Sequence, residues 1–76
     1  MLTELERYMI LDAVKTEGTY NPDEIMYLFE ESLTFPQYRK ISGFLRWVHQ
    51  TGLKFGHGNI DVVYSNYLEA KANEQA

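Results

Sequence analysis

Two histidines, His49 and His57, are the residues of this sequence that most readily ligate zinc. They stand eight positions apart, no His-x-x-x-His or Glu-x-x-His pair accompanies them, and the chain contains no cysteine. Because a zinc site needs three or four ligands that converge on one point, two isolated histidines are not enough. We therefore expect surface histidines, no metal site and no cofactor.

Nucleophilic and acid–base chemistry also lack suitable residues. Ser42 precedes His49 by seven positions, which is two helical turns and too far for a direct hydrogen bond. The turn at residues 56–58, Gly-His-Gly, lacks the Lys-Ser/Thr ending of a phosphate-binding loop. The acidic pairs at 23–24 and 30–31 fall on a polar helix face, where no burial would raise their pKa values for catalysis. The sequence predicts a protein that is not an enzyme.

Length and composition limit the chain to one small domain. Its 76 residues fit a single domain over residues 1–76, and the 14% of aromatic residues can supply a core. No apolar run approaches the roughly 20 residues of a membrane span. The first residues are acidic where a signal peptide would be basic. We expect a cytoplasmic protein that does not bind membranes.

The net charge of −4 conceals a division along the chain. Residues 1–34 hold eight acidic and two basic residues, whereas residues 35–60 hold four basic residues and no acid. Residues 61–76 are acidic again, with three acids and one lysine. This polarity predicts one positive and one negative surface, each able to meet a complementary partner.

Four helices are indicated by their start and stop signals. Two capping boxes, a cap followed by proline, and a lone asparagine mark the starts: Thr3-Glu6, Thr34-Gln37, Asn21-Pro22 and Asn59. Gly18 and Gly52 mark the ends of the first and third helices. We expect the second helix to run to Leu33 and the last residues, from Lys71 onward, to fray.

Each expected helix carries an apolar stripe with a period of 3.6 residues. The first stripe, Leu5, Met9 and Ala13, is flanked by Ile10 and Val14, so the first helix has a wide apolar sector. The other stripes are Ile25, Leu28, Phe29 and Leu33, with Met26 beside them; Tyr38, Ile41, Phe44, Leu45 and Val48; and Ile60, Val63, Tyr64, Tyr67 and Leu68. Residues 61–64 also have strand propensity, so the fourth helix competes with a strand. With short connections, the pattern predicts an all-α, compact four-helix domain.

The third helix carries the best candidate binding surface. At 100° per residue, several polar residues and a glycine fall opposite the buried row, and a lysine and a tryptophan lie along one edge. Arginine can fork onto carboxylates or phosphates, tryptophan can fill a partner pocket or stack on bases, and a mid-helix glycine permits close approach. With a lysine in the following loop, the candidate site is Arg39, Lys40, Gly43, Arg46, Trp47, Gln50 and Lys54.

A purely structural interpretation competes with this one. Gly43 and Trp47 would then pack against a neighbouring helix of the same domain. The three cations Arg39, Lys40 and Arg46 would form a solvated face balanced by the acidic helices. Both interpretations fit the sequence.

Three functions follow from these features. The first is an accessory protein that binds another protein, which the charge polarity and the aromatic residues favour. The second is a weak, salt-sensitive DNA-binding module that uses the third helix, with about four phosphate contacts available. The third, a small enzyme, is disfavoured by the absence of catalytic residues.

The stretch from Phe35 to His49, FPQYRKISGFLRWVH, resembles a family of small T4-type bacteriophage proteins encoded next to the recombination helicase UvsW. The resemblance extends over the whole chain. It implies a helicase accessory in phage DNA recombination, repair and replication, with a helicase or recombination protein as partner and DNA as an alternative partner. It also implies a fold similar to SANT-like SLIDE domains.

Overall fold

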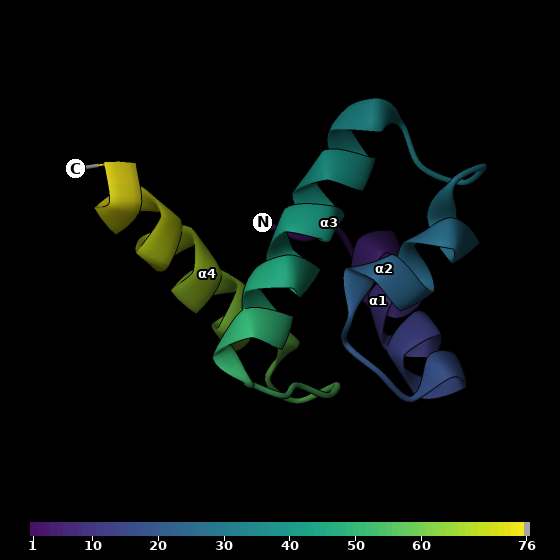
Figure 1. Ribbon diagram of the computed structural model, residues 1–76, viewed down its shortest axis with the longest axis horizontal. Helices are drawn as coiled ribbons and strands as arrows, with labels where there is room; N and C mark the ends of the chain where they lie inside the picture. Colours follow the sequence, from purple (N-terminus) through teal and green to yellow (C-terminus); the bar gives the residue numbers. More distant parts are fainter. Residues whose placement is uncertain (76) are drawn as a thin grey trace.

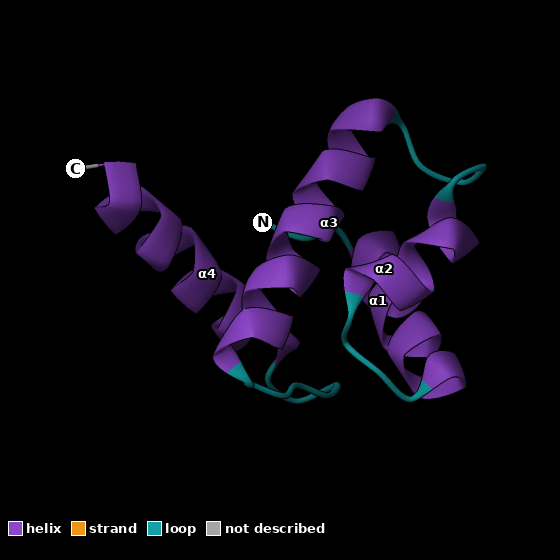
Figure 2. Ribbon diagram, viewed as in Figure 1, coloured by secondary structure: helices purple, strands orange, loops and turns teal. Residues whose placement is uncertain are grey.

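The computed structural model describes residues 1–75 and shows a helical protein (Figures 1 and 2). The elements are α1 (Glu4–Glu17), α2 (Pro22–Ile25), the 3-10 helix η1 (Met26–Phe29), α3 (Phe35–Thr51) and α4 (Ile60–Gln75). The described residues contain no strand. The predicted all-α class with four α-helices is confirmed, and the strand that competed for residues 61–64 is not formed.

The helix boundaries follow the capping signals. Thr3 and Thr34 both form the expected capping boxes, with Glu6 and Gln37 respectively. Asn21 accepts a hydrogen bond from the Asp23 N–H at 3.1 Å. Helices α1 and α3 end at glycines 18 and 52, whose φ angles of 66° and 77° lie in the left-handed region that glycine adopts without strain.

The second helix is shorter than predicted. Its α-helical part ends at Ile25, the next four residues form η1, and turns replace the helix from residue 30 onward. Residues three apart are eclipsed in a 3-10 helix, so Met26 and Phe29 both face the core, and Leu28 is left 39% exposed. The predicted stripe through Leu28 is therefore wrong, because packing of this segment selects a tighter turn than its sequence period implies.

Helix α3 is the centre of the fold. It lies between α4 on one side and α1 and α2 on the other (Figure 1). Four of the five residues of its predicted buried row have no exposed surface, and the fifth, Tyr38, is half-buried; the four are Ile41, Phe44, Leu45 and Val48. The Phe44 ring contacts the rings of Phe55, Tyr64 and Tyr67, with centroids 5.0–5.7 Å apart.

Helix α1 is rotated relative to its predicted stripe. Leu5 is 64% exposed and Met9 is half-buried, whereas Glu6, Ile10 and Ala13 are buried. A carboxylate thus lies on the buried side of α1, beside Ile10 and Ala13. Its charge is balanced there by the ion pair described below.

Helix α4 continues through Gln75, so the expected fraying from residue 71 is not seen in the described part; Ala76 lies outside it. The Asn59 carbonyl accepts the Val63 N–H at 3.0 Å, as at an N-cap. Its side chain instead accepts the Gly56 N–H at 2.7 Å, which closes the preceding loop. Leu68, predicted in the stripe, is 39% exposed.

No described helix has both the length and the apolarity needed to span a bilayer.

Candidate functional site

Four of the predicted site residues meet α4 in one groove. This hollow, of about 190 Å³, is lined by Gly43, Arg46, Trp47 and Gln50 of α3 and by Tyr67, Lys71 and Glu74 of α4. We call it the α3–α4 groove. Positions 43, 46, 47 and 50 share one side of α3 because they are three or four residues apart. The other wall of the groove depends on how α4 crosses α3.

Gly43 is where the Tyr67 side chain of α4 comes up against the surface of α3. A Cβ atom at this position would lie 2.7 Å from the Tyr67 hydroxyl oxygen. The structural interpretation of Gly43 therefore applies. Because glycine has no side chain, it leaves room for the Tyr67 side chain of the same domain. Trp47 is half-buried beside it, with its ring centroid 5.8 Å from that of Tyr67. The indole thus packs on the core and also lines the groove.

A double-mutant cycle tests the role of Gly43. Gly43→Ala adds a methyl group that conflicts with the Tyr67 hydroxyl, which offsets the gain of about 1 kcal/mol that alanine brings in a helix interior. In a Tyr67→Phe background the hydroxyl is absent, so we expect G43A to stabilise the protein by most of that amount. Urea unfolding of the four proteins measures the difference. Equal effects of G43A in both backgrounds would show that the hydroxyl does not restrict the site.

The groove is cationic and partly aromatic. Arg46 and Gln50 are exposed, and Arg46 forms no ion pair with any side chain that the structure describes. The Lys71 Nζ atom lies 6.0 Å from the centre of the Tyr67 ring. Two cations, one acid and two aromatic residues therefore surround a single hollow, an arrangement suited to a carboxylate-bearing ligand.

The other three predicted site residues lie outside the groove. Arg39 is exposed, with its guanidinium carbon 5.8 Å from the centre of the Phe35 ring. Lys54 is exposed in the loop after α3 and lines a separate small hollow with His49. Lys40 is engaged within the domain: its Nζ atom donates to Glu6 Oε1 at 2.8 Å and to the Met1 carbonyl at 2.7 Å. The structural interpretation of Lys40 therefore applies, because this lysine pairs with an acidic helix of its own chain.

The pair Glu6–Lys40 is an internal ion pair. Glu6 is 2% exposed, and its Oε1 atom also accepts the Thr3 N–H at 2.8 Å. Burial by itself raises the pKa of this carboxyl, but the Lys40 ammonium and the Thr3 N–H outweigh burial, so the Glu6 pKa lies below its ordinary value. The pair allows a carboxylate to lie among the buried residues of α1.

The side chains considered for catalysis are dispersed. His49 and His57 are both exposed, as are Asp23, Glu24 and the Glu30-Glu31 pair. In residues 1–75 we find no cluster of three or more histidine, cysteine or acidic side chains arranged to hold a metal ion. The absence of an enzymatic function stays a prediction.

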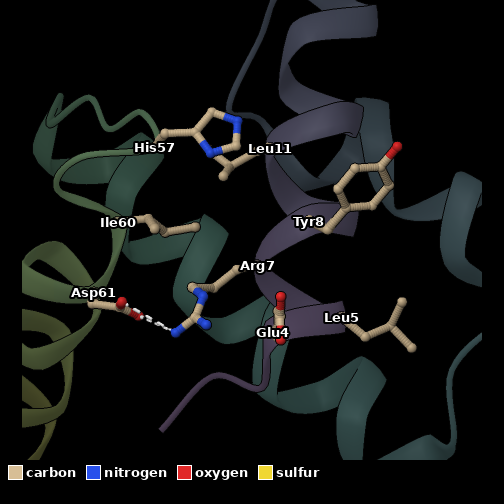
Figure 3. A pocket seen from close by; sticks show the side chains of 8 residues that line it. All are labelled: Glu4, Leu5, Arg7, Tyr8, Leu11, His57, Ile60 and Asp61. Atoms are coloured by element: carbon tan, nitrogen blue, oxygen red, sulfur yellow. Dashed lines mark hydrogen bonds and ion pairs between the residues drawn. The ribbon is translucent and has the colours of Figure 1, made fainter.

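Two features of the surface were not anticipated from the sequence. Tyr67 and Lys71, one helical turn apart on α4, complete the α3–α4 groove, although Lys71 was assigned to a frayed end. A second hollow, of about 840 Å³, lies between α1 and the segment around His57 and Asp61 (Figure 3). The wide apolar sector of the first helix was the available signal for this hollow, because it exceeds what one buried face needs.

Comparisons of the chain with protein-family models, with curated proteins and with solved structures give no match. The similarity to small phage proteins and to SLIDE domains therefore stays a prediction. The function of the protein is inferred below from the geometry of the α3–α4 groove.

Proposed function

We propose that this protein is a non-catalytic accessory protein that binds an acidic segment of a partner protein in the α3–α4 groove. One observation carries the proposal: the fold places exposed Arg46 and Lys71 beside the half-buried indole of Trp47 in a single hollow. Cations next to aromatic edges form anchoring sites in protein interfaces, where arginine and tryptophan supply much of the binding energy.

Each side chain of the groove has a distinct task in this proposal. The Arg46 guanidinium can donate two parallel hydrogen bonds to a carboxylate of the partner, and the Lys71 ammonium adds a second positive charge. The Gln50 amide can donate to or accept from the partner's backbone. The Trp47 ring is already held by the core, so little side-chain entropy is lost when a ligand covers it.

The sequence resemblance suggests which partner to test first. It points to a recombination helicase of a T4-type phage, or another recombination protein, in the cytoplasm of the host cell. A role in phage DNA recombination, repair and replication would then be exerted through the helicase.

Direct DNA binding is the alternative, and the distribution of charge favours it less. Lys40 is neutralised by Glu6, and Arg39 and Lys54 lie outside the groove. Glu74 also lines the groove, so Arg46, Lys71 and Glu74 together give a net charge of +1, which suits a single carboxylate better than a run of phosphates. With so few cations in one place, binding to DNA would be weak and strongly dependent on salt.

Titration calorimetry with the purified helicase tests the proposal. We expect Arg46→Glu and Lys71→Glu each to weaken binding by at least ~10-fold, because each places a like charge against the acidic segment. Arg46→Glu should leave the circular dichroism spectrum unchanged, since Arg46 is exposed. Arg39→Glu is the matched control, with the same change of charge on the same helix but outside the groove.

Equal weakening by R39E and R46E would contradict the groove as the contact and would indicate a general electrostatic effect of α3. A titration of fluorescent single-stranded and branched DNA at low and moderate salt distinguishes direct DNA binding from binding of the helicase. Salt-dependent DNA binding that is lost in R46E, without any binding of the helicase, would replace the proposed function by DNA binding.

A further inference from the structure

Helix α1 carries a largely exposed stripe, of which one leucine also packs against the edge of the core. Its members are Glu4, Tyr8, Leu11 and Lys15, spaced four, three and four residues apart, which places them on one face of the helix. Glu4, Tyr8 and Lys15 are exposed, Tyr8 by 66%, and Leu11 is half-buried. We call this set the α1 stripe.

The α1 stripe lies along a continuous groove. The hollow of about 840 Å³ lies between Glu4, Tyr8 and Leu11 on one side and His57, Ile60 and Asp61 on the other (Figure 3). A second hollow, of about 410 Å³, shares Tyr8, Leu11 and His57 with the first and extends to Lys15. The groove therefore follows α1 from Glu4 to Lys15, a length of about 17 Å.

The order of residues in the α1 stripe is self-complementary. Read from either end, a charged residue precedes two apolar ones and a residue of opposite charge follows. If a second copy of the helix runs antiparallel about a two-fold axis between Tyr8 and Leu11, Glu4 faces the partner's Lys15 and Tyr8 faces the partner's Leu11. Symmetry repeats both contacts, so two apolar layers are flanked by two ion pairs.

We propose that α1 pairs antiparallel with α1 of a second copy of this chain, forming a two-fold symmetric dimer. The partner's Tyr8 ring enters the groove beside Leu11. The Arg7–Asp61 ion pair, 3.2 Å long, already satisfies the charges that line the groove near Glu4, so no unpaired cation is buried there. A single helix pair buries less than the roughly 1,600 Å² of a standard interface, so we expect a weak dimer in equilibrium with the monomer.

The inference is independent of the proposed function because the two grooves share no residue. A dimer would carry two α3–α4 grooves. It could therefore hold a partner with two acidic segments more tightly than a monomer could, by raising the effective concentration of the second site.

Sedimentation velocity over a concentration series tests the dimer. We expect the wild-type protein to pass from monomer to dimer. Lys15→Glu and Glu4→Lys should each raise the dimer dissociation constant by at least ~10-fold, since each places like charges opposite one another. The double variant E4K/K15E should return it to within ~3-fold of wild type, because the ion pairs re-form with their signs exchanged. Glu31→Lys, on an exposed residue elsewhere, is the matched control.

Circular dichroism shows whether each variant is folded, and Tyr8→Ser supplies an uncharged variant that we also expect to be monomeric. A wild-type protein that stays monomeric to about 1 mM would overturn the proposal. Dimerisation that neither single charge reversal weakens, or that the double variant fails to restore, would overturn the antiparallel arrangement of the helices.

Discussion

Lys40→Met is expected to destabilise the folded protein by about 3 kcal/mol at neutral pH, the lower end of the range for breaking a buried ion pair. The substitution removes the only cation within 4 Å of the Glu6 carboxylate in the described structure, and Glu6 is 2% exposed. Methionine retains most of the apolar stem of lysine, so the loss comes from the ammonium group, which pairs with Glu6 and also donates to the Met1 carbonyl. The free energy of unfolding in urea measures the effect.

The pH dependence of stability should change sign in this variant. In the wild-type protein the Glu6 pKa is lowered in the folded state, so its contribution to stability is present above the unfolded value and is lost as the pH falls through the folded value. In K40M, burial without a cation raises the Glu6 pKa, and protonation then favours the folded state. Below about pH 5, we therefore expect acid to destabilise the wild-type protein and to stabilise K40M relative to neutral pH.

The double variant Glu6→Gln/Lys40→Met is the control. Glutamine keeps the capping box with Thr3 but carries no charge, so no carboxylate is left buried and most of the lost stability should return. If E6Q/K40M is as unstable as K40M, the apolar and steric role of the lysine stem is what matters, and the ion pair is not what stabilises α1.

Phe44→Ala is expected to cost about 3–5 kcal/mol, a large part of the stability of so small a domain. Phe44 is fully buried at the middle of α3, and its ring contacts three other aromatic rings. These rings come from the loop after α3 and from α4, so the cavity would loosen both segments. Thermal unfolding followed by circular dichroism at 222 nm should show the loss as a fall in Tm.

Phe44→Leu provides the matched comparison, because it keeps an apolar side chain in the same place and should cost much less than the alanine variant. Leu45→Ala, at another fully buried position of α3, should cost about 2–5 kcal/mol. A Phe44→Ala protein with wild-type Tm would show that the aromatic cluster does not hold α4 against α3.

The capping residues allowed the helix boundaries to be predicted from the sequence. A capping box or a C-terminal glycine acts within one turn of the helix, so Thr3, Thr34, Gly18 and Gly52 are informative without any knowledge of the fold. The rotation of α1 could not be predicted in this way. It places Glu6 on the buried side, and the cation that pairs with Glu6 there, Lys40, lies 34 residues away in the sequence.

Part of the candidate site could also be predicted, because the geometry of a single helix is local. Arg46, Trp47 and Gln50 share one side of α3 through helical geometry alone, so their grouping follows from the sequence. Tyr67 and Lys71 join them because α4 packs beside α3 with the Tyr67 side chain against Gly43, which no local pattern specifies. Lys40 has the same spacing signal as its neighbours, yet the fold assigns it to an internal ion pair.

The most direct test of the proposed binding site uses the indole N–H signal of Trp47, the single tryptophan of the chain. When the ¹⁵N-labelled protein is titrated with unlabelled helicase, we expect this signal and the Gln50 side-chain amide signals to shift or broaden. In the Arg46→Glu variant, the same changes should require higher concentrations of the helicase. A Trp47 signal that stays unchanged while the helicase binds, or binding that Arg46→Glu does not weaken, would contradict the α3–α4 groove as the contact.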